Sequence, residues 1–127
     1  MKLPPKQNDE ASLLRLGQEA VSLLEQRDFQ SLAERFDYAL KFDRSPVAAI
    51  EGDFQTCLAE FHGLSEQPTA VLPSMSVKYF KPNSSNLVAV VECVFTTVEG
   101  CPIPAELIVT SLGNEKYITL EDLSLAL

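Results

Sequence analysis

The chain contains a single histidine, His62, among its 127 residues. A metal site built from several histidines is therefore excluded, as is a catalytic pair of histidines. A Ser-His-Asp arrangement is compatible with the residue order, but no serine lies in a GxSxG turn. His62 directly precedes Gly63 at the end of a predicted helix, where a cationic side chain stabilises the helix dipole. We therefore interpret His62 as a helix-end residue rather than as a catalytic base.

Cysteine is also scarce, and Cys57, Cys93 and Cys101 show neither a CxxC motif nor a Cys/His spacing. An odd number of cysteines suits a reducing compartment. We predict that all three are reduced and structural, with Cys101, beside a turn, as the only rapidly reacting thiol. The sequence also lacks a glycine-rich phosphate loop and carboxylates at metal-ligand spacing. We expect no metal and no cofactor.

No apolar run reaches the roughly 18 residues of a membrane span. The first ten residues contain two prolines where a signal peptide would need an apolar stretch. Lys and Arg number 10 against 18 Asp and Glu, which gives a net charge of −8. Such a balance disfavours nucleic acid and anionic membranes, because both require clustered cations. We predict a cytoplasmic protein, whose acidity serves solubility or attracts a basic partner.

The composition, with 46% hydrophobic and 22% charged residues, is that of a globular protein. The length predicts a single domain over residues 1–127, with residues 1–7 flexible. Helical periodicity runs from residue 8 to about residue 26, with Asn8 or Asp9 as N-cap. The phase of the apolar stripe changes at Arg27-Asp28, which predicts a second helix capped by Asp28. The second apolar stripe comprises Phe29, Leu32, Ala33, Phe36 and Leu40.

A third helix is predicted to begin with Ser45 as N-cap and Pro46 at its first position. Gly63 is expected to end it in the left-handed conformation. Gly52 in its middle costs up to about 1 kcal/mol relative to alanine. We interpret Gly52 as a position that allows another element to approach closely.

Strand patterns follow the helices at residues 77–81, 87–98, 103–112 and 117–125. The connecting loops are short, so the strands are predicted to form an antiparallel meander. Pro102 and Pro104 have the same parity, which predicts an unpaired side near the start of the third strand. The fold class expected is α+β, with three N-terminal helices packed on a curved four-stranded sheet.

The stretch EAVSLLEQRDFQSLAERFD resembles a pattern of the nuclear-transport-factor-2-like superfamily, also called the cystatin-like fold. The pattern is an aliphatic helix, a small or charged residue plus Asp, an aromatic residue, and a helix ending in Phe-Asp. Members often have glycine where this chain has Arg27, and the chain lacks an early hairpin between its second and third helices. The matching positions are Leu23, Leu24, Arg27, Asp28, Phe29, Leu32, Phe36 and Asp37.

This resemblance covers roughly the first 40 residues, and the remainder matches in element order. It implies that the helices close over a concave sheet to form a cone-shaped pocket. Some superfamily members are isomerases, dehydratases or cyclases, and many are non-catalytic binding or assembly modules. Many also dimerise through the sheet. The fold alone therefore does not supply a function.

Glu92 and Glu106 are the candidate catalytic residues, because each lies within an apolar strand. Desolvation there would raise the carboxyl pKa toward a value suited to a general base. A two-residue Glu99-Gly100 loop would pair Cys93 with Glu106 and put the two glutamates on opposite faces. A one-residue bulge would put them on the same face. The alternative is that each points to solvent or to the outer face of the sheet.

The first functional hypothesis is a non-catalytic homodimer that binds a small apolar ligand or a protein partner. The second is a small isomerase or dehydratase that uses Glu92 or Glu106 as general base. The third is an acidic secretion chaperone or immunity-type protein. The dimer is predicted to form through the sheet, because residues 87–98 are apolar on both faces and three helices cover only one.

Overall fold

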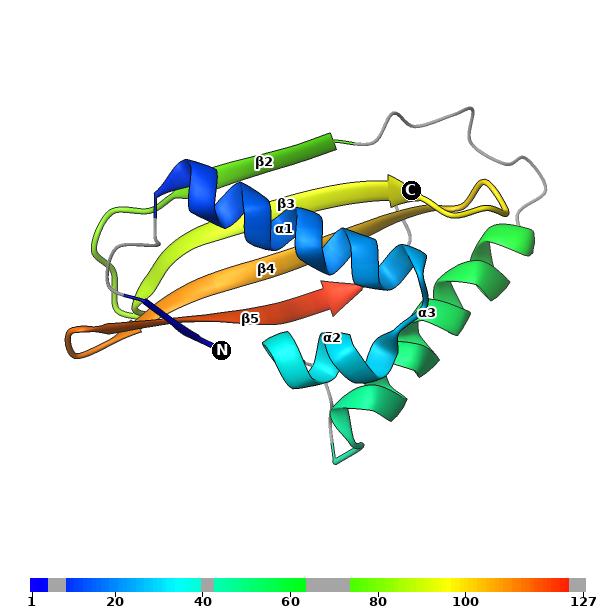
Figure 1. The fold of residues 1–127 in the computed structure, drawn as a ribbon, viewed down its shortest axis with the longest axis horizontal. Helices are drawn as coiled ribbons and strands as arrows, with labels where there is room; N and C mark the ends of the chain where they lie inside the picture. The colour runs from blue at the N-terminus through cyan, green and yellow to red at the C-terminus, as the bar shows by residue number, and fades with distance from the viewer. Residues whose placement is uncertain (5–8, 40–42, 64–73, 124–127) are drawn as a thin grey trace.

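The computed structural model describes residues 1–4, 9–39, 43–63 and 74–123. Three helices lie on one face of an antiparallel five-stranded sheet with strand order β1-β5-β4-β3-β2 (Figure 1). The elements are β1 (Lys2–Leu3), α1 (Glu10–Glu25), α2 (Phe29–Phe36), α3 (Pro46–His62), β2 (Ser74–Tyr79), β3 (Leu87–Thr96), β4 (Pro102–Leu112) and β5 (Glu115–Leu123). The α+β class is confirmed. None of the helices in the described ranges is long and apolar enough to cross a bilayer.

The prediction of four strands was wrong, because Lys2 and Leu3 add a fifth strand at the edge of β5. Leu3 is only 3% exposed and belongs to the core. We expected residues 1–7 to be flexible, but Lys2 and Leu3 form this strand. Residues 5–8 lie outside the described ranges. A two-residue strand shows no alternation of apolar and polar residues, so the sequence pattern does not reveal it.

The other strands match the predicted meander with shifted ends. β2 begins at Ser74 rather than at residue 77, and β5 begins at Glu115 and is described up to Leu123. β3 ends at Thr96, two residues early, because residues 97–101 form the loop to β4. Within this loop, the Gly100 amide donates to the Thr97 carbonyl and the Thr97 amide to the Cys101 carbonyl, both at 2.9 Å.

The predicted break between the first two helices is confirmed. Arg27 has φ +55°, a left-handed conformation that ends α1. The Arg27 amide donates to the Leu24 carbonyl and the Asp28 amide to the Leu23 carbonyl, which is the bonding of a helix end closed by a left-handed residue. Asp28 then caps α2 by accepting a hydrogen bond from the Ser31 amide at 3.1 Å.

Helix α3 begins as predicted, since the Ser45 hydroxyl accepts from the Ala48 amide at 3.2 Å. The left-handed conformation predicted for Gly63 at its end was wrong. Gly63 has φ −81°, in the right-handed region, and its amide bonds to the Ala59 carbonyl. The last turn is closed by ordinary helical hydrogen bonds, so no left-handed residue is required there.

The close approach expected at Gly52 occurs instead at Gly17 of α1. A Cβ atom built on Gly17 would lie 3.0 Å from Met75 Sδ, 3.0 Å from Val91 Cγ1 and 3.1 Å from Cys93 Sγ. A Cβ atom built on Gly52 would meet only Arg44 Nη1, at an ordinary contact distance of 3.5 Å. Gly17 therefore allows α1 to pack directly on β2 and β3.

The core lies between the helices and the inner face of the sheet. Side chains of β3 alternate, with Val91, Cys93 and Phe95 buried under α1. Val90, Glu92 and Val94 have the opposite parity and lie on the outer face. In the described ranges, the helices contact β2, β3 and β5 from the inner side only.

Candidate functional site: a cavity at the end of helix α1

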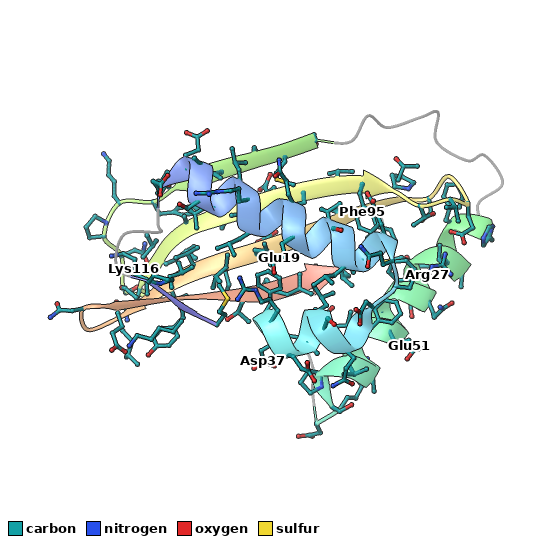
Figure 2. The ribbon with its side chains drawn as sticks, in the orientation of Figure 1. Glu19, Arg27, Asp37, Glu51, Phe95 and Lys116 are labelled. Atoms are coloured by element: carbon teal, nitrogen blue, oxygen red, sulfur yellow. The ribbon has the colours of Figure 1, made fainter. Side chains whose placement is uncertain are left out.

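A cavity of about 460 Å³ lies where the end of α1 meets α3 and the β3–β4 loop. This volume falls in the range of small-molecule sites, about 300–1,000 Å³. Figure 2 shows Arg27 and Phe95 at the same end of the molecule. The residues that line the cavity are Leu24, Glu25, Gln26, Arg27, Phe54, Phe95, Thr96, Thr97 and Val98.

Local sequence explains how the cavity forms. Helix α1 stops before Arg27, so its last turn forms one wall without extending across the opening. Phe54 belongs to the buried stripe of α3, and Phe95 is the last inward-facing residue of β3. Val98 lies on the following loop and is 96% exposed. Phe54 and Phe95 are almost fully buried, at 1% and 2% exposure, so they contribute little open surface to the cavity. The loop of residues 97–101 borders it.

Arg27 is the cationic group of this cavity. Its guanidinium carbon lies 5.2 Å from the centre of the Phe54 ring, within the range of a cation–π contact. Arg27 Nη2 also donates to Glu99 Oε1 in an ion pair. The Arg27 and Glu99 side chains are 38% and 28% exposed, so solvent weakens this ion pair.

The carboxyl group of Glu99 is held in its charged form. Partial burial opposes its ionisation, but hydrogen bonds from Thr97 and Arg27 outweigh burial and lower the pKa of Glu99 below its ordinary value. The loop that carries Glu99 turns at Gly100, whose φ of +86° suits glycine. The loop therefore presents an ionised carboxylate to Arg27.

The two predicted catalytic residues lie elsewhere, on the outer face of the sheet. Thr96 pairs with Pro102, so the loop has five residues instead of two, and Glu92 lies directly opposite Glu106. The same-face alternative is therefore correct, and Gly100, with φ +86° and its amide bonded to the Thr97 carbonyl, forms the bulge at the turn. Glu92 is exposed and Glu106 is half-buried. Neither residue lines the cavity.

Glu106 lies in a row of carboxylates across three strands. It pairs with Glu92 on β3 and with Asp122 on β5. Burial, followed by the charges of Glu92, Glu121 and Asp122, raises the pKa of Glu106. Like charges directly opposite each other destabilise a sheet. The raised pKa therefore reflects mutual repulsion and partial burial on a surface, away from an enclosed pocket.

The cysteines are all buried and free. Cys101 is 0% exposed, which contradicts its predicted role as a fast-reacting thiol. Although it adjoins the turn, its side chain points into the core, where Sγ donates to the Cys57 carbonyl at 3.8 Å. Burial raises the pKa of Cys57 to about 12 and that of Cys93 to about 11.

His62 is the last residue of α3, as predicted. The centre of its ring lies 5.7 Å from the centre of the Phe61 ring, in an edge-on arrangement. Among the described residues, no group of three or more His, Cys, Asp or Glu side chains could hold a metal ion.

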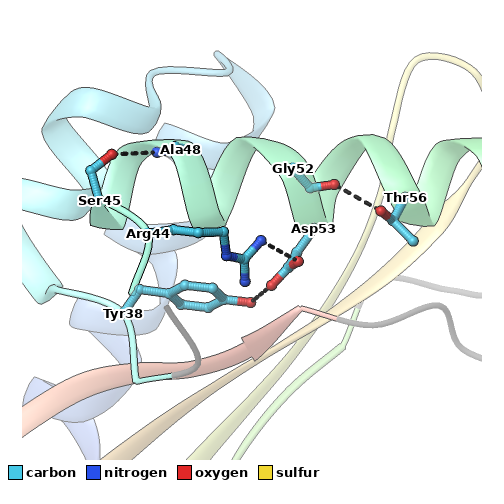
Figure 3. A network of polar contacts seen from close by, with 7 residues as sticks. All are labelled: Tyr38, Arg44, Ser45, Ala48, Gly52, Asp53 and Thr56. Atoms are coloured by element: carbon cyan, nitrogen blue, oxygen red, sulfur yellow. Dashed lines mark hydrogen bonds and ion pairs between the residues drawn. The ribbon is translucent and has the colours of Figure 1, made fainter. Parts of the chain in front are cut away.

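A polar network that joins the buried Tyr38 to the partly exposed Asp53 and Arg44 was not predicted from the sequence (Figure 3). The Tyr38 hydroxyl donates to Asp53 Oδ2 at 2.6 Å, and Arg44 Nη1 lies 3.3 Å from Asp53 Oδ1. Burial, together with the hydrogen bond to Asp53, raises the pKa of Tyr38. The network joins the segment after α2 to α3, and its residues are not among those that line the cavity at the end of α1.

Comparisons of the chain with protein-family models, with curated proteins and with solved structures find no match. The candidate site therefore rests on its residues and their geometry alone. The sequence analysis did not predict this site. The signal that could have indicated it is Arg27, a non-glycine residue at a helix break.

Proposed function

We propose that this chain is a non-catalytic binding protein whose cavity at the end of α1 accepts a small, largely apolar ligand. The observation that supports this most directly is the cavity itself. It has room for a ligand of several heavy atoms, and its volume lies in the range of small-molecule sites. Its lining combines four apolar residues, of which Val98 is the exposed one, with five polar residues that include Arg27.

The geometry gives less support to the enzymatic alternative. A general base must lie within about 2.6–3.2 Å of the proton that it abstracts, or reach it through one water. Glu92 and Glu106 share the outer face of the sheet and are separate from the cavity. No observation in the described residues favours a secretion chaperone or an immunity-type protein.

We also propose the nuclear-transport-factor-2-like cone as the fold family. The arrangement of three helices on one face of an antiparallel sheet supports it. The φ of +55° at Arg27 adds to this, because members often have glycine at the matching position.

We also propose that two copies of the chain form a homodimer through the outer face of the sheet. Val94, Pro104 and Ile108 are half-buried and supply apolar surface there. Two copies paired through this face would also bring together their rows of carboxylates, which include Glu106. We therefore expect a dimer that weakens as those carboxylates ionise.

Binding is tested with N-phenyl-1-naphthylamine, a neutral probe whose fluorescence rises in an apolar site. We expect saturable binding to the wild-type protein. Val98→Ser at the rim should weaken it about threefold, because it removes apolar contact area. Leu112→Ser is the matched control, since Leu112 is also exposed, at 69%, but does not line this cavity. An absence of saturable binding, or equal effects of both variants, would contradict the proposal.

A further inference from the structure

We propose that the ligand of this cavity carries a single carboxylate on an apolar body, and that Arg27 binds this carboxylate in exchange for Glu99. This inference rests on the proposed binding function and adds the chemical class of the ligand. It follows from the position of Arg27, from its two described contacts and from the other charges at the cavity.

The backbone conformation of Arg27 sets the direction in which its side chain leaves the end of α1. Its left-handed φ of +55° is a conformation that glycine adopts without a steric penalty and other residues adopt rarely. Because α1 ends there, the side chain projects from the last turn toward the cavity and lies over the Phe54 ring. The cation of Arg27 and the exposed apolar side chain of Val98 thus line the same cavity, so a ligand can place a charged end and an apolar end there together.

The described contacts of the guanidinium leave it able to bind a second carboxylate. Glu99 is contacted through Nη2, and the guanidinium carbon lies 5.2 Å from the centre of the Phe54 ring. A guanidinium carries five N–H donors in one plane, and two of them can bind one carboxylate side by side. Since the Arg27–Glu99 pair is partly exposed, a ligand carboxylate can replace Glu99 without breaking a buried ion pair.

The remaining charges limit the ligand to one negative charge. Glu25 also lines the cavity, and Glu99 stays nearby when it is displaced. The whole chain has a net charge of −8. A dianion such as a phosphate monoester would meet stronger repulsion from these carboxylates than a monoanion would. A medium-chain carboxylate fits both this charge limit and the exposed apolar side chain of Val98.

The test compares octanoate with 1-octanol, which have the same chain length and differ in charge. Each is titrated against the protein bound to N-phenyl-1-naphthylamine. We expect octanoate to displace the probe at a concentration about tenfold lower than octanol, as for a charge-assisted hydrogen bond. Octyl phosphate should displace it less well than octanoate does.

Three variants and one control test whether the charge of Arg27, rather than a general change in the protein, favours binding of a carboxylate. Arg27→Gln should reduce the preference for octanoate over octanol about tenfold, and Arg27→Gly should do the same with a residue suited to the backbone. Glu99→Gln should strengthen octanoate a fewfold, because it removes the competing carboxylate. Arg35→Gln is the matched control, since Arg35 pairs with Glu19 and does not line the cavity.

The outcomes distinguish this inference from the proposed function. If octanol and octanoate displace the probe equally, or if the Arg27 variants leave the preference for octanoate unchanged, the carboxylate proposal is overturned while ligand binding stands. If the probe does not bind to the wild-type protein at all, both proposals fail. Circular dichroism of each variant verifies that it is folded before its titration is interpreted.

Discussion

Replacing Glu106 with glutamine should stabilise the protein at pH 7. Glu106 lies directly opposite Glu92 on β3 and Asp122 on β5, and no cation is described in contact with its carboxylate. Glutamine keeps the size of the side chain and removes the charge. Both cross-strand repulsions are therefore lost in one substitution, without a cavity or a new buried group.

The magnitude follows from the two charge pairs. A like-charged pair directly across a sheet destabilises by roughly 0.2–1 kcal/mol. Since Glu92 is exposed and Glu106 half-buried, we expect a gain of about 0.5–1.5 kcal/mol for Glu106→Gln. This corresponds to a rise in melting temperature of roughly 2–6 °C for a domain of this size. Glu92→Gln should give about half the gain, because its neighbour on β2 is the uncharged Ser76.

The pH dependence has a definite sign. The pKa of Glu106 is raised in the folded state, so the folded protein binds more protons than the unfolded chain between the ordinary carboxyl pKa and this raised value. The wild-type protein therefore loses stability as pH rises through that window. The advantage of Glu106→Gln should be complete above the window and absent below about pH 4.

Urea unfolding followed by circular dichroism at several pH values measures these differences. Glu10→Gln serves as a matched control. Glu10 lies in the first turn of α1, where its charge is favourable, so this variant should lose about 0.3–1 kcal/mol. The reasoning would be refuted by a Glu106→Gln variant no more stable than wild type at pH 7. A gain that persists unchanged at pH 3.5 would refute it as well.

Three further predictions concern packing, thiols and assembly. Gly17→Ala should lower the free energy of unfolding by about 1–3 kcal/mol, because its methyl group would overlap Met75 and the β3 side chains. Gly52→Ala should raise it by up to about 1 kcal/mol, since the site has room and alanine favours helix. A thiol reagent should find no fast-reacting cysteine in the native protein and three after unfolding, and one rapid thiol would contradict the burial of all three. Light scattering should give twice the 14.0 kDa chain mass, with dissociation shifted to lower concentration on acidification, and a monomer at micromolar concentration would exclude the dimer.

Local signals determined much of the fold. Asp28 and Ser45 cap their helices as the sequence predicted, because an N-cap side chain bonds to an amide only three residues away. The break at Arg27 was visible as a change of phase in the apolar stripe. The strands and their antiparallel order followed from apolar runs separated by short turns. None of these features depends on a distant part of the chain.

Other features depended on partners far away in sequence. The two-residue strand at Lys2 exists only because β5 offers an unpaired edge. Gly17 and Gly52 look alike in sequence, yet only Gly17 meets a neighbouring strand. Cys101 adjoins a turn but points toward Cys57, which lies 44 positions earlier. Such pairings are set by how the elements pack, and a local pattern carries no information about them.

The candidate site shows the same division. The sequence alone located an unusual residue, Arg27, at a helix break, and two carboxylates within apolar strands. Only the tertiary structure decided that Arg27 lies with Phe54 and Phe95 at a cavity, while Glu92 and Glu106 lie together on the outer face. The physical reason is that the register of a strand decides which face of the sheet each of its side chains occupies. One residue more or less in the β3–β4 loop exchanges the two faces of a strand, and that loop length is set by how residues 97–101 close their own hydrogen bonds.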